Sequence, residues 1–188
     1  SGSLDNPVSP CAFALGAGAR FVARAIDTQQ PRLVETLKRA HAHRGASFIE
    51  IFQNCVVYND GVFDDFAEKS VALDMQVHVQ HGKPLLFGAD GKKGLRLIPG
   101  KLELEIVTVG EGGVGEGDIL VHDETNAALA SLLAGLRPPR FPMAIGVLFC
   151  SPAPSYNELV EEQLVAAGSD RDLNALLRRG RTWSVEAK

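Results

Sequence analysis

The fold can be predicted outward from one stretch, Gly45-Ala-Ser-Phe-Ile-Glu-Ile-Phe-Gln-Asn-Cys-Val-Val-Tyr-Asn-Asp-Gly61. Residues 46–53 are mostly apolar and rich in β-branched and aromatic types, which predicts a short buried strand. The strand runs directly into Cys55 and then into a loop at Asn59-Asp60-Gly61. Open α/β sheets place their ligands just past the carboxyl ends of strands. Cys55 is therefore the first candidate for a functional side chain, and the alternative is a small buried hydrophobe, the usual role of an isolated cysteine.

The residues before this stretch predict a βαβ unit. Ser9-Pro10 supplies a helix cap and a proline for the first turn of a helix over residues 11–19. Residues 21–26 are apolar enough for a strand, and residues 31–44 carry the apolar spacing of an amphipathic helix. With the strand at 46–53 they form one unit, which we expect to be parallel and right-handed.

Two parallel strands are too few for a doubly wound sheet. Both are apolar enough to need cover on two faces and neighbours on both edges. The chain also opens with a helix of the kind that should follow an earlier strand. We therefore expect the back half of a domain, whose strands pack against a missing N-terminal half or against a neighbouring subunit.

The rest of the chain predicts a mixture of helices and short strands. An acidic segment at 62–75 favours helix. Between residues 83 and 121 the residue pattern is typical of strands, and after it helical patterns dominate. The predicted strands are 85–87, 95–98, 102–109, 118–121 and 145–149, and the predicted later helices are 125–135, 156–167 and 170–179.

Composition excludes several functional classes. The 188 residues are 45% hydrophobic, as in globular proteins, and carry a net charge of −4, which argues against nucleic-acid and anionic-membrane surfaces. No apolar run approaches the roughly 18 residues of a membrane span, and no signal peptide is visible. Three widely spaced cysteines, Cys11, Cys55 and Cys150, do not form a disulfide framework and suit a reducing cytoplasm.

Other candidate sites are weaker than Cys55. The glycines of Gly110–Gly115 match the dinucleotide-binding spacing, but they precede a predicted strand rather than a helix, so a hairpin loop is favoured. The pairs His41/His43 and His78/His81 lack a third ligand nearby in sequence. The aspartates lack the spacing of a calcium loop and favour a helix start. This acidic trio is Asp60, Asp64 and Asp65.

The sequence resembles the β subunit of 2-oxoacid:ferredoxin oxidoreductases, above all the 2-oxoglutarate type. The resemblance rests on PVSPCAFALGAGARFVARAID at 7–27 and on GASFIEIFQNCVVYNDG at 45–61, the most specific part. It continues through ILVHDE, IGVLF, YNELVEEQL, LNALL and TWSV, and thus spans nearly the whole chain.

This resemblance implies an activity, cofactors and partners. Such enzymes oxidatively decarboxylate a 2-oxoacid with coenzyme A, using thiamine diphosphate with magnesium, and pass electrons through a [4Fe–4S] cluster to ferredoxin. The resemblance also implies an α subunit as partner. It implies that three cluster cysteines lie near the N-terminus of the β subunit and that Cys55 is the fourth, as a thiolate ligand to iron.

The chain departs from the family pattern in ways that set its expected role. It lacks the Gly-Asp-Gly-Asp segment and Asn pair that bind magnesium and pyrophosphate, and it lacks a C-x-x-C motif. We therefore expect a C-terminal portion of the subunit that does not turn over alone. Residues 1–58 would be the back half of a parallel, flavodoxin-like thiamine diphosphate domain, and residues 59–188 a mixed α+β extension. The alternative function is a non-catalytic subunit-docking module without a cofactor.

Overall fold

The computed structural model describes residues 4–5, 7–168, 172–180 and 183–186. Contacts divide the chain into two compact units, Ser1–Ala153 and Pro154–Lys188, which are described separately. The predicted boundary at residue 58 follows the family pattern rather than compactness, and it stays a prediction. The helices are α1 (Pro10–Gly16), α2 (Gln30–Ala42), α3 (Asp64–Ala67), α4 (Ala72–Met75), the 3₁₀ turn η1 (Glu116–Asp118), α5 (Ala127–Ala134), α6 (Tyr156–Ala166) and α7 (Leu173–Leu177).

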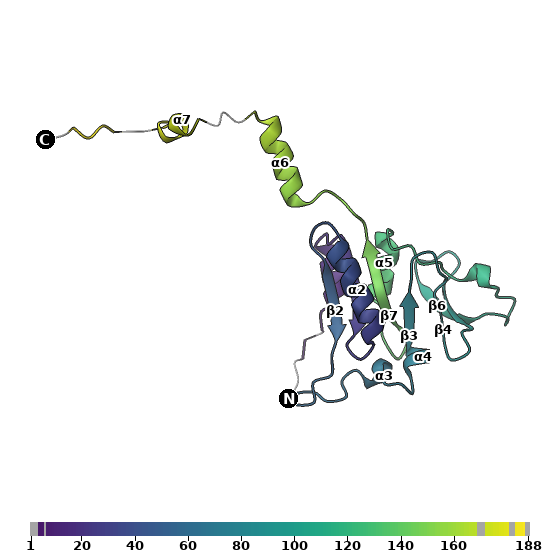
Figure 1. Cartoon of the computed structure of the whole chain (residues 1–188). Coiled ribbons are helices and arrows are strands. Elements are labelled where there is room, and N and C mark those ends of the chain that lie inside the picture. The colour runs from purple at the N-terminus through teal and green to yellow at the C-terminus, as the bar shows by residue number, and fades with distance from the viewer. Residues whose placement is uncertain (1–3, 6, 169–171, 181–182, 187–188) are drawn as a thin grey trace. The chain divides into compact units, whose positions relative to one another are not determined.

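The first unit contains a mixed four-stranded sheet. Its strands are β1 (Phe21–Ile26), β2 (Phe48–Phe52), β3 (Gln76–Val79) and β7 (Met143–Cys150), in the order β2-β1-β7-β3. β1 pairs with β2 in parallel, which confirms the predicted pairing of the βαβ unit. β7 runs antiparallel to β1 and parallel to β3. The result is the predicted α/β class, a partial flavodoxin-like sheet (Figure 1).

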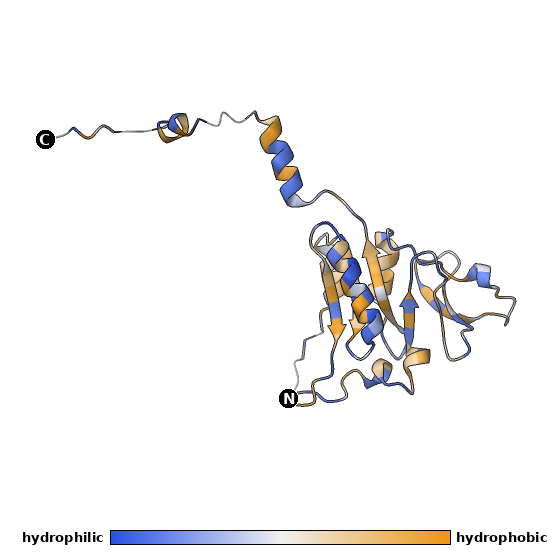
Figure 2. Ribbon diagram, in the orientation of Figure 1, coloured by the Kyte–Doolittle hydropathy of each residue, from blue (hydrophilic) through white to orange (hydrophobic). Residues whose placement is uncertain are grey.

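Helices cover both faces of this sheet. On one face α1 and α5 pack together and against β1 and β7, and their small buried side chains, Cys11, Ala14, Ala130 and Ala134, allow close approach. On the other face α2 packs over β1 and β7 through Ala40, which contacts the buried side chains Phe21, Ala23 and Val147. Strands β1 and β7 are accordingly apolar along most of their length, whereas α2 presents polar residues outward (Figure 2).

β7 is irregular where it pairs with β1, and a glycine follows the irregularity. The register shifts between Val22 and Ala23, whose partners are Phe149 and Val147, so Leu148 is the extra residue of a bulge. Gly146, opposite Arg24, has φ +124°, and a Cβ there would lie 2.6 Å from the carbonyl oxygen of Val79. Only glycine fits this position without displacing β3.

A second, smaller sheet packs beside the first. Strands β4 (Leu86–Phe87), β5 (Lys93–Leu97) and β6 (Leu104–Thr108) form an antiparallel meander and overlap the predicted strands 85–87, 95–98 and 102–109. Buried Leu85, Phe87, Leu95 and Leu104 join the core that also contains α1 and α5. One set of side chains thus holds the two sheets together in the first unit.

Three predictions about these elements are wrong. β3 was not predicted as a strand, because it is only four residues long and follows directly on helical α4. The predicted strand 118–121 is instead the end of η1 and a loop with an isolated bridge between Pro84 and Val121. β1 has a partner on each edge within the chain, so only β2, which pairs with β1 alone among the described strands, keeps the open edge that was predicted.

The described residues of the second unit include two short helices, α6 and α7. α6 begins at Ser155, whose hydroxyl accepts from the backbone N–H of Glu158 while the Glu158 carboxylate accepts from the backbone N–H of Ser155, a capping box. α7 begins at Asp172, an N-cap residue whose carboxylate accepts the backbone N–H groups of Asn174 and Ala175. It is shorter than the predicted helix 170–179, of which residues 170 and 171 lie outside the described residues.

Candidate functional site

Cys55 lies on an exposed turn past the carboxyl end of β2. Ile26 and Phe52, the last residues of β1 and β2, are paired, so the two parallel strands end at one edge of the sheet. Cys55 lies three residues past Phe52, and the backbone N–H of Asn59 donates to its carbonyl oxygen at 3.0 Å, which closes a tight turn. The Cys55 thiol is free and exposed. The alternative of a buried core cysteine is therefore wrong for this residue, although its predicted role as an iron ligand stays a prediction.

An amide side chain closes the loop that carries this turn. The side-chain nitrogen of Asn54 donates to the Asp60 carboxylate at 2.8 Å, and its oxygen accepts the backbone N–H of Gly61 at 3.0 Å. Gly61 has φ +73°, a left-handed conformation that favours glycine. The two ends of residues 54–61 are thus joined by side-chain as well as backbone hydrogen bonds.

Three phenylalanines fix the same loop to the sheet. The rings of Phe52, Phe63 and Phe66 lie 5.0 to 5.8 Å apart between centroids, in tilted and edge-on arrangements. They pack with Ile26 and Ile145 in one buried cluster. Phe52 precedes the loop and the other two follow it, so the cluster anchors both of its ends to the carboxyl edge of the sheet.

The other two cysteines are not placed to act as thiolates. Cys11 is fully buried on α1, and its Sγ donates to Glu50 Oε2 at 3.3 Å. Burial raises the pKa of the Cys11 thiol to about 12, so it stays protonated at neutral pH. Cys150 is half-buried near His43, and burial also raises the pKa of its thiol. Both positions are those of packing side chains rather than of reactive thiolates.

The remaining predicted residues do not converge on a metal site. His43 packs against the ring of Phe21 while His41 is exposed, and His78 and His81 have different partners. Asp60 is held by Asn54, and Asp64 and Asp65 form the first turn of α3, the predicted helix start. Within the described residues no three His, Cys, Asp or Glu side chains are grouped to hold an ion.

The glycine-rich segment also lacks the context of a dinucleotide site. It follows β6 and folds back on itself, with the N–H of Gly110 donating to the carbonyl of Val114 at 2.8 Å. What comes next is the three-residue turn η1, not a helix whose N-terminus could hold a pyrophosphate. The segment is a turn, as the sequence pattern favoured.

A buried ion pair between β1 and β2 was not predicted from the sequence. Arg24 of β1 is fully buried, and its Nε donates to Glu50 Oε2 of β2 at 2.7 Å. Its Nη2 donates to the carbonyl of Ala134 at 3.0 Å, whereas Nη1 has no partner. The available signal was one charged residue in each of two otherwise apolar, neighbouring strands.

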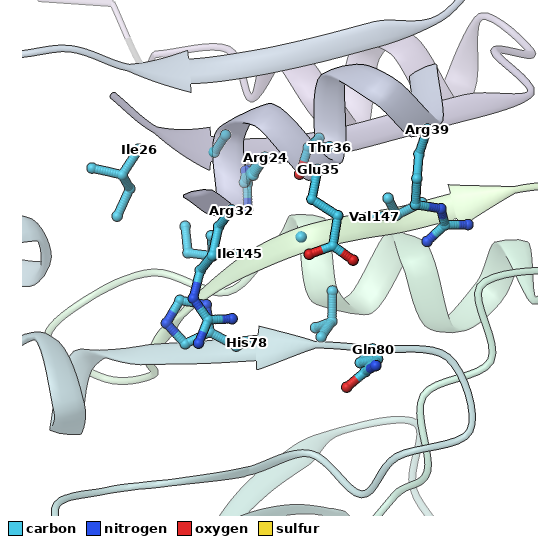
Figure 3. Close-up of a pocket in the computed structure, with 13 residues that line it drawn as sticks. Arg24, Ile26, Arg32, Glu35, Thr36, Arg39, His78, Gln80, Ile145 and Val147 are labelled. Atoms are coloured by element: carbon cyan, nitrogen blue, oxygen red, sulfur yellow. The ribbon is translucent and has the colours of Figure 1, made fainter. Parts of the chain in front are cut away.

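A small cavity lies between α2 and the sheet strands β1, β3 and β7. Its volume is about 160 Å³, and its floor includes Ile145 and Val147 of β7. Figure 3 shows Arg32 beside His78 at one end, with Glu35 and Arg39 further along the helix. Arg39 is already paired with Glu124 through two hydrogen bonds of 2.7 and 3.0 Å.

We expect His78 to make the first unit sensitive to acid. Burial, with a smaller contribution from the charge of Arg32, lowers the pKa of His78 from 6.5 to about 4. The unfolded chain therefore binds this proton more readily, and stability is expected to fall as pH drops from 6.5 towards 4. His78→Gln should flatten that decline in urea unfolding midpoints measured between pH 7 and pH 4. The exposed His41→Gln is the control, and an equal pH slope in wild type and His78→Gln would contradict the assignment.

Comparisons with known proteins decide the family. No protein-family model matches the chain. The chain aligns with the 2-oxoglutarate oxidoreductase subunit KorB of Mycobacterium tuberculosis. The alignment has 193 positions, covers 98% of the chain and shows 35% identity. The chain is similar to the β subunits of 2-oxoacid:ferredoxin oxidoreductases. It covers about half, 50%, of the KorB subunit that it matches.

Other relatives agree with this assignment. A 2-oxoacid:ferredoxin oxidoreductase β subunit of Aeropyrum pernix is 43% identical over 58 residues, 31% of this chain and 18% of that subunit. In structure the chain is similar to a 2-oxoglutarate:ferredoxin oxidoreductase from Magnetococcus marinus with 2-oxoglutarate, coenzyme A and succinyl-CoA bound. The match has a TM-score of 0.60 at 19% identity and covers 96% of this chain and 47% of that one, so it supports the fold. The resemblance predicted from the sequence is confirmed.

Proposed function

We propose that this chain is part of a β subunit that takes part in oxidising a 2-oxoacid, 2-oxoglutarate first, to its acyl-CoA with ferredoxin as electron acceptor. The observation that carries the proposal is the 35% identity to a 2-oxoglutarate oxidoreductase subunit along 98% of the chain. The bound 2-oxoglutarate and coenzyme A named for the solved relative agree with it. The proposal places the chain in a complex with an α subunit, in the cytoplasm.

We propose Cys55 as the one cluster ligand that this chain contributes. A [4Fe–4S] cluster is normally held by four thiolates. Of the three cysteines of the chain, Cys11 is buried, Cys150 is half-buried and Cys55 is exposed. The described residues offer no grouping that could complete a cluster, and no segment resembles a thiamine diphosphate or magnesium site. The residues of this chain alone therefore do not fit a [4Fe–4S] cluster or thiamine diphosphate. In the proposed complex the chain would supply one ligand, Cys55, to the cluster.

The isolated 188-residue chain is expected to bind neither thiamine diphosphate nor a stable cluster. Metal sites need their full set of ligands, and a single thiol cannot supply it. Isothermal titration calorimetry with thiamine diphosphate and magnesium, and iron analysis after anaerobic reconstitution, measure the two losses. Stoichiometric thiamine binding or a retained cubane spectrum in this chain would contradict the prediction.

The function itself is tested in the assembled enzyme. A complete β subunit, produced with its α subunit, should reduce ferredoxin in the presence of coenzyme A and 2-oxoglutarate, and more slowly with pyruvate. Iron and thiamine are measured in the same preparation. An assembled complex that holds neither group and reduces no ferredoxin would favour the alternative, a subunit-docking module without a cofactor.

A further inference from the structure

Three polar side chains that line the cavity between α2 and the sheet make no hydrogen bond to the residues that the structure describes. They are Arg32 and Thr36 of α2 and His78 of β3 (Figure 3). Thr36 is only 6% exposed, so its hydroxyl has little access to water outside the cavity. Buried polar groups are normally paired. These unused groups therefore indicate that a ligand or water fills the space.

The three groups favour a ligand that accepts hydrogen bonds and carries negative charge. The guanidinium of Arg32 has only donors, and a neutral imidazole and a hydroxyl can each add one. Burial and the charge of Arg32 lower the pKa of His78 to about 4, so Arg32 supplies the positive charge at neutral pH. Arg39, another cation that lines the cavity, is already bound by Glu124. A carboxylate meets a guanidinium through two parallel hydrogen bonds, which makes it the matching head group.

The rest of the cavity limits the size and the charge of this ligand. Its volume of about 160 Å³ is close to the roughly 150 Å³ of a cavity that holds benzene. The floor at Ile145 and Val147 is apolar, so it offers few partners to water and suits a hydrocarbon chain. Glu35, on the next turn of α2 after Arg32, places a negative charge beside the same space and repels a second carboxylate. A short-chain monocarboxylate fits both the volume and the charge, whereas a dicarboxylate does not.

We propose that the cavity between α2 and the sheet binds a small monocarboxylate, with Arg32, Thr36 and His78 as donors to its carboxylate and the apolar floor beneath its chain. No residue of the loop 54–61 lines this cavity, so the inference does not rest on the proposed role of Cys55 or on the proposed function. All the residues that line it belong to the first unit, so the 188-residue chain is sufficient for the test. 2-Oxoglutarate, a dicarboxylate, should bind here poorly.

The test is a titration of the 188-residue chain with butyrate, followed by NMR signals of the His78 ring that are assigned by comparison with His78→Gln. The signals should shift saturably with a dissociation constant of about 1 mM, because so small a ligand makes few contacts. The bound carboxylate should also raise the pKa of His78 by about 1 or more. Butyramide, the uncharged analogue, and 2-oxoglutarate should each bind at least about tenfold more weakly.

Variants of α2 separate this site from a general effect of charge. Arg32→Met should weaken butyrate binding at least about tenfold, because the charge-assisted hydrogen bonds are lost. Thr36→Val keeps the shape and removes one hydrogen bond, so it should weaken binding about fivefold. The matched control is Lys38→Met, which removes the same charge from an exposed position of α2 that does not line the cavity. It should leave butyrate binding unchanged.

Three results would overturn the proposal. The first is the absence of a saturable shift of the His78 signals at butyrate concentrations far above the expected dissociation constant, which would leave the three donors to water. The second is an equal loss of binding in Arg32→Met and Lys38→Met. The third is inorganic phosphate that binds as tightly as butyrate, because the cavity would then select for charge alone and not for a carboxylate with an apolar chain.

Discussion

In a complete β subunit assembled with its partner, Cys55→Ala is expected to lose most of its cluster iron and nearly all 2-oxoacid-dependent reduction of ferredoxin. The variant removes one of the four thiolates that normally hold a [4Fe–4S] cluster. Cys55→Ser keeps the shape and offers a harder oxygen ligand, so it should retain some cluster with an altered reduction potential. Decarboxylation itself could survive both changes, because that chemistry belongs to the thiamine cofactor.

Cys11→Ala and Cys150→Ala are the matched controls for this measurement. Cys11 is buried, and its thiol donates to Glu50, so its loss should cost about 1–2 kcal/mol of stability while iron content stays at the wild-type level. Cys150 is half-buried and should cost less. Iron content and ferredoxin reduction are compared across all three alanine variants. If Cys55→Ala keeps wild-type values of both, Cys55 is not a ligand.

Sequence patterns predicted the elements whose signal is local. β1 was predicted with its observed bounds because six mostly apolar residues lie between clear helix signals, and β4 and β5 overlap the predicted strands 85–87 and 95–98. β3 was missed because it is only four residues long, and its buried Gln76 accepts a hydrogen bond from the side chain of Gln29, 47 positions away. The position of β7 beside β1 could not be predicted, because it joins residues more than a hundred positions apart.

The candidate site divides in the same way. The exposed position of Cys55 past a strand end follows from the order of strand, cysteine and turn residues, which is local information. Two other features depend on which side chains face each other once the chain has folded. They are the hydrogen bonds by which Asn54 closes the Cys55 loop and the ion pair of Arg24 with Glu50. Parallel pairing places Arg24 directly opposite Glu50, so a register prediction would have found the ion pair.

The ion pair leads to the largest expected effect on stability. Glu50→Ala should destabilise the first unit by about 3–5 kcal/mol, because it leaves the guanidinium of Arg24 buried without its counter-charge. Arg24 has no exposed surface, and its other side-chain donors reach only the carbonyl of Ala134 at 3.0 Å and, at 3.5 Å, the hydroxyl of Ser9. Neutral oxygens cannot replace a carboxylate at 2.7 Å. The thiol of Cys11 also loses its acceptor in this variant.

The double variant Arg24→Met/Glu50→Leu separates charge from packing. Replacing both partners with apolar side chains of similar size removes the buried charge, and such replacements are often neutral or stabilising. We expect the double variant to recover most of the loss, whereas Arg24→Met alone leaves Glu50, which is 14% exposed, with a smaller cost. Urea unfolding of the 188-residue chain, followed by circular dichroism, completes the double-mutant cycle. A loss below about 1 kcal/mol for Glu50→Ala would show that the guanidinium finds water or another partner, and that the pair does not hold β1 to β2.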